Sequence, residues 1–338
     1  MRKRLIVPVV VVALALLAGA CGDSSPSTSS GSAGKSGTIR LGFSAWPGWF
    51  PWQVAEEKGI FAKHGLKVEL TYFESYTDSL NALASGNLDA NSQTLNDTVS
   101  SVAGGAKQTI VLTNDNSTGN DQIIGGPGIN SIADLKGKKV GAEQGTVDHY
   151  LLLLALKKAG LSATDIDFQP LETGAAAAAF ASGRLDAVGA FAPFTTQALA
   201  RSGSKALATS ADFPGAIPDH LVFSRDFLSA HGDEVQMLID AWFDTLAFLK
   251  SSPAEATAIM AKKGGVSVAD YQSYDKGTTL FSLEDNVTAF TPGTTTKSLD
   301  FEAKEIATFL LTAKLIDKAP DLSGLFDASF VKARAAKP

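Results

Sequence analysis

Two nearly identical stretches occur in this chain, Ala82-Leu-Ala-Ser-Gly-Asn-Leu-Asp-Ala90 and Ala179-Phe-Ala-Ser-Gly-Arg-Leu-Asp-Ala187. In each stretch an apolar helical pattern stops at Ser-Gly, where glycine suits a helix C-cap, and Leu-Asp-Ala then begins a strand. We therefore expect the chain to use one helix-to-strand unit in each of two lobes. Because this motif makes a good turn, we assign its residues a structural role and not a ligand contact.

Strand and helix patterns alternate around both copies. Before and around the first copy we expect strands at 38–43, 67–73, 88–91 and 108–112, with helices at 51–64, 76–84 and 95–103. Around the second copy we expect strands at 139–142, 166–171 and 187–191, with helices at 149–159, 174–181 and 195–201. Such alternation predicts mainly parallel sheets flanked by helices, so the fold class is α/β with two lobes.

Two short apolar strands, 122–125 and 220–224, are interpreted as the crossings between the lobes. This assigns residues 38–122 and 220–338 to lobe 1 and residues 123–219 to lobe 2. After Arg225 the pattern is nearly all helical, with periodic apolar positions at 235–249 and 299–311.

The first 20 residues have the three parts of an export signal: the basic Arg2, Lys3 and Arg4, an apolar run, and small residues before a cleavage point. Leu17-Ala-Gly-Ala-Cys21 resembles a bacterial lipobox, in which the cysteine is lipidated and becomes the new N-terminus. We expect residues 1–20 to be a lipoprotein signal peptide and residues 21–37, rich in Ser and Gly, to be a flexible tether. A plain secretory signal and a membrane anchor are the alternatives.

Composition limits the function of the body. The formal net charge of −6 makes nucleic acid a poor partner. A single cysteine rules out an intramolecular disulfide and a thiolate metal centre, and the four histidines show no metal-ligand spacing. The sequence also lacks a phosphate loop, a dinucleotide-binding glycine motif and a nucleophile elbow. We therefore expect no enzyme activity, no cofactor and no metal.

Several stretches, in order, resemble the substrate-binding proteins of ABC importers in the nitrate, sulfonate and taurine branch, which includes binders of thiamine precursors. They are Ser44-Ala-Trp-Pro-Gly-Trp-Phe-Pro-Trp52, Val54-Ala-Glu-Glu-Lys-Gly-Ile-Phe61, Gly65-Leu-Lys-Val-Glu69, Leu83 to Asp89, Leu135-Lys-Gly-Lys-Lys-Val-Gly141, Leu156 to Leu161, and Ala179 to Asp186 with Ala190-Phe-Ala-Pro-Phe194. The resemblance covers about residues 38 to 315. It implies a type II periplasmic-binding-protein fold with the ligand cleft between the lobes.

A narrower resemblance is to the binding proteins encoded beside urea-carboxylase-type enzymes, a group associated with guanidine metabolism. It rests on Asn116-Ser-Thr-Gly-Asn-Asp121, Val147-Asp-His-Tyr-Leu-Leu152 and the tryptophan-rich loop. This resemblance implies a urea-like or guanidine-like ligand.

In open α/β sheets the ligand lies beyond the carboxyl ends of the strands, which identifies the candidate loops. The residues that we predict to bind the ligand are Ser44, Trp46, Trp49, Glu74, Tyr76, Gln93, Asn96, Asp97, Asp121, Gln144, Thr146, Asp148, His149, Thr173 and Phe191. Trp52 lies one turn into a helix, so we expect it in the core.

Acidic residues in these loops favour a cationic ligand. Anion-binding relatives are expected to use a helix N-terminus after the Lys-Val-Gly strand, but here Asp148 falls in that turn and would repel an anion. Asp148 is equally well explained as a helix cap or first-turn acid. Trp46 and Trp49 can offer ring faces to a guanidinium or ammonium group, each contact contributing about 0.5 to 2 kcal/mol.

The sequence therefore predicts the extracytoplasmic solute-binding component of an ABC importer, lipid-anchored at the outer face of the cell membrane, that captures a small polar nitrogen or sulfur compound by hinge closure. Its partners would be the permease, the ATPase and the membrane, and we expect a monomer. The alternatives are a sulfonate, taurine or nitrate ligand, or ligand presentation to a membrane sensor.

Overall fold

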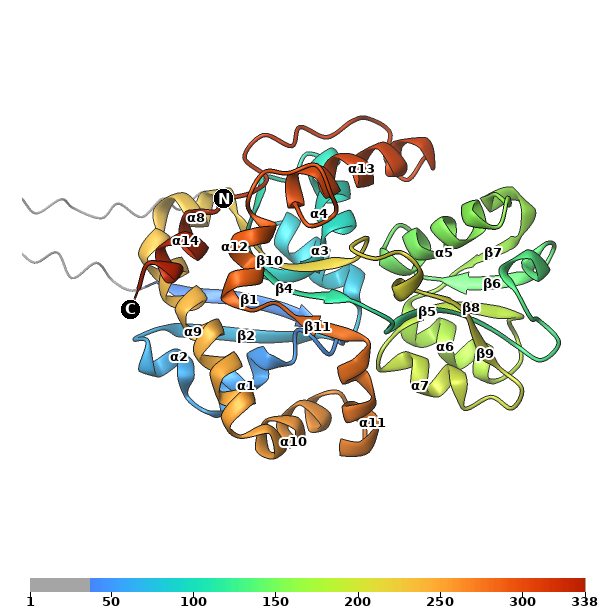
Figure 1. Ribbon diagram of the computed structural model, residues 1–338, viewed down its shortest axis with the longest axis horizontal. Coiled ribbons are helices and arrows are strands. Elements are labelled where there is room, and N and C mark those ends of the chain that lie inside the picture. Colours follow the sequence, from blue (N-terminus) through green and yellow to red (C-terminus); the bar gives the residue numbers. More distant parts are fainter. Residues whose placement is uncertain (1–36, 338) are drawn as a thin grey trace, which may run out of the picture. The chain divides into compact units, whose positions relative to one another are not determined.

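Two β-sheets organise the chain (Figure 1). The computed structural model describes residues 37–337, which lie in one compact unit. The predicted signal peptide, the lipidation site Cys21 and nearly all of the tether lie outside the described residues.

The first sheet has six strands in the order β11-β4-β10-β3-β1-β2, and we call the part of the chain around it lobe 1. Its strands are β1 (Thr38–Ser44), β2 (Lys67–Phe73), β3 (Ala90–Thr94), β4 (Gln108–Ser117), β10 (Pro218–Ser224) and β11 (Thr278–Leu280). β1 is parallel to β2 and β3, whereas β10 is antiparallel to both β3 and β4 and β11 is antiparallel to β4. Four strands, β1 to β4, thus run in one direction, and β10 and β11 run in the opposite direction.

The second sheet has five strands in the order β7-β6-β8-β5-β9 and defines lobe 2. Its strands are β5 (Asp121–Gly125), β6 (Lys139–Ala142), β7 (Asp167–Pro170), β8 (Ala187–Phe191) and β9 (Lys205–Thr209). Within this sheet β5 is antiparallel to its two neighbours, and the other four strands run in the same direction. The expected α/β fold with mainly parallel sheets is confirmed.

Helices pack around both sheets. Those of lobe 1 before the crossing are α1 (Pro51–Glu57), α2 (Ile60–Lys63), α3 (Tyr76–Ala84) and α4 (Leu95–Ala103), and those of lobe 2 are α5 (Val147–Lys158), α6 (Thr173–Ala181) and α7 (Phe194–Leu199). The C-terminal part contributes α8 (Arg225–Ala230), α9 (Gly232–Ser251), α10 (Pro253–Lys263), α11 (Val268–Ser273), α12 (Leu283–Ala289), α13 (Leu299–Thr312) and α14 (Ser329–Ala335). Short 3-10 turns lie at Ile132–Leu135, Ala163–Asp165, Ser210–Asp212 and Tyr274–Lys276.

The repeated motif has the same structural role in both lobes. Asp89 and Asp186 each accept a hydrogen bond at 2.9 Å from the backbone N–H of the first residues of a parallel strand, Arg40 in β1 and Lys139 in β6. The preceding leucine of each copy packs on a glycine of that strand. A Cβ added to Gly42 would lie 2.4 Å from Leu88, and one added to Gly141 would lie 2.5 Å from Leu185.

Three sequence expectations need correction. The helix expected at 51–64 is divided into α1 and α2, because Gly59 takes the left-handed conformation with φ of 64° and interrupts the hydrogen-bond ladder. The strand expected at 88–91 begins at Ala90 and extends to Thr94. The tail, expected to be nearly all helical, also contains β11, which adds an edge strand to the first sheet.

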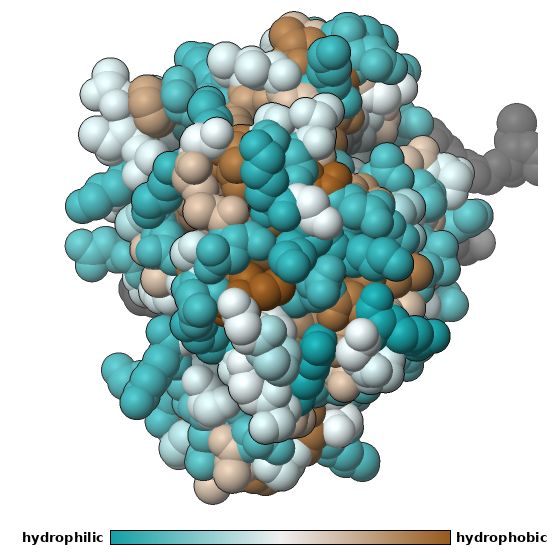
Figure 2. Space-filling view, turned by 90° about the vertical axis from the view of Figure 1, so that its right-hand side faces the viewer, coloured by the Kyte–Doolittle hydropathy of each residue, from teal (hydrophilic) through white to brown (hydrophobic). Residues whose placement is uncertain are grey.

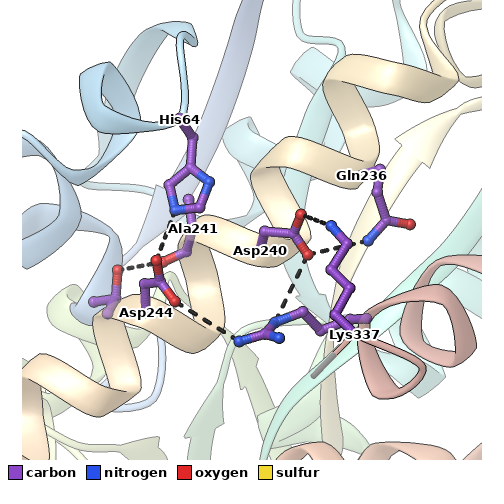
Figure 3. Close-up of polar contacts among 8 residues, drawn as sticks. His64, Gln236, Asp240, Ala241, Asp244 and Lys337 are labelled. Carbon is purple, nitrogen blue, oxygen red and sulfur yellow. Dashed lines mark hydrogen bonds and ion pairs between the residues drawn. The ribbon is translucent and has the colours of Figure 1, made fainter.

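The long helix α9 joins the core to the C-terminal end of the chain. Its Trp242 packs on Trp52 with ring centroids 4.5 Å apart, and the full burial of Trp52 confirms its expected core position. On the other side of α9, Asp240 pairs with Lys337, and Asp244 accepts a 2.8 Å hydrogen bond from His64 (Figure 3). α9 thus holds both α2 and the end of α14.

The surface at the lobe 2 end is mainly hydrophilic, with small hydrophobic patches separated from one another (Figure 2). Of the helices in residues 37–337, none is long and apolar enough to cross a bilayer.

Candidate ligand-binding cleft

The chain passes between the sheets twice, and the two passages lie together. β4 ends at Ser117 before β5 begins at Asp121, and the return passage runs from Ser210 to β10. Ser117 and Ser210 share a 2.7 Å hydrogen bond, and the Ser117 N–H donates to the carbonyl of Ile217. These contacts bring the carboxyl ends of β1, β3 and β8 to the same place as the amino ends of the crossing strands β5 and β10.

Four aromatic rings from both lobes form a closed ring at this place. Trp46 and Trp49 come from the loop after β1, Tyr76 begins α3, and Phe191 ends β8 in lobe 2. Successive centroids are 6.4 Å apart for Trp46 and Trp49, 5.5 Å for Trp49 and Tyr76, 6.3 Å for Tyr76 and Phe191, and 6.2 Å for Phe191 and Trp46. Aromatic faces gathered in this way are typical of sites for organic cations.

A very small cavity of about 10 Å³, roughly the room of one water molecule, lies against these rings. Besides the four aromatic residues, it is lined by Ala45, Thr94, Asp121, Val147, Ile217 and Asp219. A neighbouring cavity, also of about 10 Å³, is lined by Ser44, Ala45, Glu74, Ser75, Tyr76, Glu143, Glu172, Thr173, Gly174, Phe191 and Phe194. Among these described lining residues there are acids but no Lys or Arg.

The tryptophan loop is tied directly to a buried acid. The indole N–H of Trp46 donates to Asp115 Oδ1 at 2.8 Å. The other carboxylate oxygen, Oδ2, lies so close to the backbone of Gly48 that a Cβ there would be 1.9 Å from it. Only glycine at this position leaves room for Asp115.

Five aspartates around the cleft are at most 2% exposed: Asp97, Asp115, Asp121, Asp148 and Asp219. Burial raises the pKa of Asp97, Asp115 and Asp121 to about 7 each. It raises the pKa of Asp148 and Asp219 well above the usual value, helped by neighbouring carboxylates. These carboxyl groups therefore favour their neutral, protonated forms unless a cation balances their charge.

Within residues 37–337 none of these five carboxylates forms an ion pair with Lys, Arg or His. Asp115, Asp121 and Asp148 each have one carboxylate oxygen without a hydrogen-bond donor in the described part of the chain, and Asp219 has two. The adjacent His220 supplies no positive charge, because burial lowers its pKa to about 3. Across the same residues, no three His, Cys, Asp and Glu side chains are placed to hold a metal ion.

Glu143 connects the two lobes. It follows β6 in lobe 2, and its Oε1 accepts from the N–H of Thr77 at 3.1 Å and from the Thr77 hydroxyl at 2.5 Å, at the start of α3 in lobe 1. Its Oε2 accepts from the N–H and hydroxyl of Thr173, the first residue of α6, at 3.3 and 2.9 Å. One carboxylate thus receives donors from both lobes.

The hydroxyl of Thr173 also lies 2.7 Å from Asp148 Oδ2. A hydroxyl carries one hydrogen and can donate to only one of the two carboxylates, Glu143 or Asp148. The other contact requires a protonated carboxyl group as the donor. The raised pKa of Asp148, caused mainly by its burial, identifies Asp148 as the protonated partner.

The structure brings most of the predicted site residues together. Trp46, Trp49, Tyr76, Asp121 and Phe191 line the first cavity, and Ser44, Glu74 and Thr173 line the second. Asp148 contacts Thr173, whereas Asp97 accepts from Thr94 Oγ1 at 2.6 Å and from Asn96 at 2.9 Å. Asp97 and Asn96 therefore do not line the first cavity, and Asp97 contacts Thr94, which does.

Besides Asn96, Asp97 and Asp148, four predicted residues line neither cavity. The side chain of Gln93 is buried in lobe 1, where its Nε2 donates hydrogen bonds to Thr98 and Gln108. Thr146 bonds the carbonyl of Glu143 within its own turn. His149 accepts from Gly145 and stacks on Phe168, and Gln144 is exposed.

Sequence reasoning missed Asp219, Thr94 and Ile217 as cavity residues. Asp219 is the second residue of β10, which runs antiparallel to β3 and β4, so the amino end of β10 meets their carboxyl ends. Thr94 ends β3, which was expected to stop three residues earlier. The acid Asp219 beside the predicted crossing 220–224 is the signal that could have identified this position.

Known proteins support this assignment of the fold. Residues 32–263 match the model of the NMT1-like family. A Brucella abortus protein named as a binding protein is 30% identical over 236 residues, which are 68% of this chain and 73% of that protein. A Bacillus subtilis protein named as binding aliphatic sulfonates is 28% identical over 98% of this chain and 96% of its own length.

Among solved structures, the alkanesulfonate-binding protein of Xanthomonas axonopodis, bound to MOPS, superposes with a TM-score of 0.74 at 20% identity, covering 86% of this chain and 98% of that one. The desulfurization enzyme DSZB shares the fold too, with a TM-score of 0.63 at 15% identity, covering 88% of this chain and 98% of that enzyme. The expected periplasmic-binding-protein fold and the resemblance to the nitrate, sulfonate and taurine binding proteins are confirmed. With the family model matched over residues 32–263, the chain belongs to the NMT1-like family.

Proposed function

We propose that this protein is the extracytoplasmic solute-binding component of an ABC importer and that its ligand is a small organic cation. The observation that carries the ligand class is the group of five buried aspartates beside four aromatic rings, with no basic side chain paired to any of them in residues 37–337. A buried carboxylate is costly unless it is neutralised by a proton or paired with a cation.

The aromatic rings and the carboxyl groups suit a compact organic cation. The four rings pack against one another around a cavity of about 10 Å³, so the ligand would enter as the lobes open and would then meet the ring faces by cation–π attraction. Asp121 and Asp219 line the same cavity and have free acceptor oxygens for N–H donors of the ligand. A guanidinium or urea-like compound, as in the urea-carboxylase-associated branch, meets both requirements.

Aliphatic sulfonate, taurine or nitrate is the second candidate. The Bacillus subtilis and Xanthomonas axonopodis proteins named for sulfonates favour it. Against it stands Glu143 beside the starts of α3 and α6, where an oxyanion would meet a carboxylate that already receives the backbone donors.

Capture requires no covalent step. The ligand would stabilise the closed arrangement of the lobes by binding it more tightly than the open one, and the permease would receive the closed form. We further propose a monomer that is held at the outer face of the membrane by lipid on Cys21, with the permease and its ATPase as partners. A binding protein for a membrane sensor would work in the same way.

Thermal unfolding of residues 38–338 with guanidinium chloride, urea, tetramethylammonium, taurine, methanesulfonate and nitrate tests the ligand class. A ligand of the folded state at 100 times its Kd adds about 2.7 kcal/mol of stability. We expect Tm to rise with guanidinium or tetramethylammonium at millimolar concentration and to stay unchanged with the anions. A rise with taurine or methanesulfonate alone would assign the protein to the sulfonate binders.

A further inference from the structure

We propose that Glu143 determines the charge selectivity of the cleft: its carboxylate joins the two lobes and, in doing so, keeps anionic ligands out. This inference rests on the proposed function, since it explains how a member of a family with sulfonate-binding relatives would select a cation.

The contacts of Glu143 explain the joining role. Its carboxylate is 4% exposed and accepts four hydrogen bonds, two from Thr77 in lobe 1 and two from Thr173 in lobe 2. No other side chain described in residues 37–337 bonds the backbone N–H groups at the starts of both α3 and α6. Opening the lobes would break the Thr77 pair and leave the Thr173 pair within lobe 2.

The position of Glu143 explains the exclusion of anions. The first turns of α3 and α6 each carry free N–H groups and the positive end of a helix dipole. Such ends attract oxyanions, but here a protein carboxylate already receives these donors. A second anion in the neighbouring cavity would lose that attraction and would be repelled by the Glu143 charge.

Two variants of Glu143 and one control distinguish the effect of its negative charge from the effect of its side-chain length. Glu143→Gln keeps the length and one acceptor oxygen but removes the charge. Glu143→Asp keeps the charge but is too short to reach both lobes. Glu69→Gln is the matched control, because Glu69 is an exposed acid of β2 that lines neither cavity.

The first readout is small-angle X-ray scattering of the ligand-free proteins. We expect Glu143→Asp and Glu143→Gln both to have a larger radius of gyration than the parent protein, and Glu69→Gln to match it. Thermal unfolding of each variant verifies that it is folded. Unchanged scattering of both Glu143 variants would overturn the joining role.

The second readout is calorimetric titration with methanesulfonate. We expect Glu143→Gln to bind it at least tenfold more tightly than the parent protein, while Glu143→Asp and Glu69→Gln do not. Equal affinities of Glu143→Gln and Glu143→Asp, or equally tight binding by the parent protein, would overturn the role of the charge. Failure of the parent protein to bind guanidinium would refute only the proposed ligand, because neither readout on Glu143 uses a cation.

Discussion

Asp219 is a residue that should lower the stability of the ligand-free protein and contribute to the binding of a cationic ligand. It is buried next to Asp115 across the β10 and β4 pair, and both of its carboxylate oxygens lack a donor in the described chain. Burial and then the Asp115 charge raise its pKa. A carboxyl group in this state is stabilised by a proton or by a cation.

We expect Asp219→Asn to bind guanidinium at least tenfold more weakly, since a charge-assisted hydrogen bond contributes about 1.5 to 3 kcal/mol. Without ligand, at pH 8, the same variant should unfold at a higher temperature than the parent protein, because a buried charge has been removed. Calorimetric titration and thermal unfolding measure the two effects. The exposed Asp317→Asn is the control, and a lower Tm of ligand-free Asp219→Asn would contradict the argument.

At the scale of elements, the loop between β1 and α1 has two structural roles. It presents Trp46 and Trp49 to the cavity, and it packs its backbone at Gly48 against Asp115. The loop is therefore fixed by the acid that the aromatic rings surround.

Gly48→Ala should disrupt this arrangement. The added methyl group would lie 1.9 Å from Asp115 Oδ2, so either the loop or the carboxylate must move. We expect a fall in guanidinium affinity of tenfold or more and a lower Tm. Gly232→Ala, where an added Cβ has no atom within 4 Å, should change neither value. Unaltered binding by Gly48→Ala would show that the loop position does not matter to the site.

Elements with strong local signals could be predicted from the sequence. The helices 76–84 and 95–103 and the strand 67–73 have the predicted bounds, because apolar periodicity and glycine stops coincide there. β11 could not be predicted, because its three residues Thr278–Leu280 take strand form only by pairing with β4. The division between α1 and α2 depends on the backbone of Gly59, which an apolar pattern does not encode.

The same distinction applies to the cleft. Trp46, Trp49 and Phe191 were predictable because they follow or end strands that carry clear patterns. Gln93 was expected in a loop after the strand, but β3 extends to Thr94. Gln93 is therefore part of the strand, and its side chain donates a hydrogen bond to Thr98. The interlobe bond of Glu143 depends on how two distant helices meet, and no local pattern predicts it.

At the scale of the whole molecule, the buried acids make stability and binding depend on pH in opposite ways. Asp97, Asp115 and Asp121 have pKa values raised from 3.8 to about 7 in the folded protein. The folded state therefore holds more protons than the unfolded chain between these values, and the stability that they contribute is lost as pH rises from about 4 to about 7. A cationic ligand prefers the ionised carboxylates.

We expect the Tm of the ligand-free protein to fall between pH 5 and pH 8, and the affinity for guanidinium to rise over the same range with release of protons. Thermal unfolding across this range measures the first effect. Titration calorimetry in buffers of different ionisation enthalpy measures the second. Binding that is independent of pH and releases no protons would mean that these carboxyl groups do not meet the ligand.

The central place of β10 in its sheet also governs the order in which the protein can be built. β10 separates β3 from β4, so these strands have no direct pairing without it. All five strands of the other sheet are complete by Thr209, whereas β10 begins at Pro218. During synthesis from the N-terminus, the inserted lobe 2 can therefore finish its sheet while lobe 1 still has a gap at its centre. β1, β2 and β3 can pair early, but β3 and β4 must wait for β10 before they share a partner.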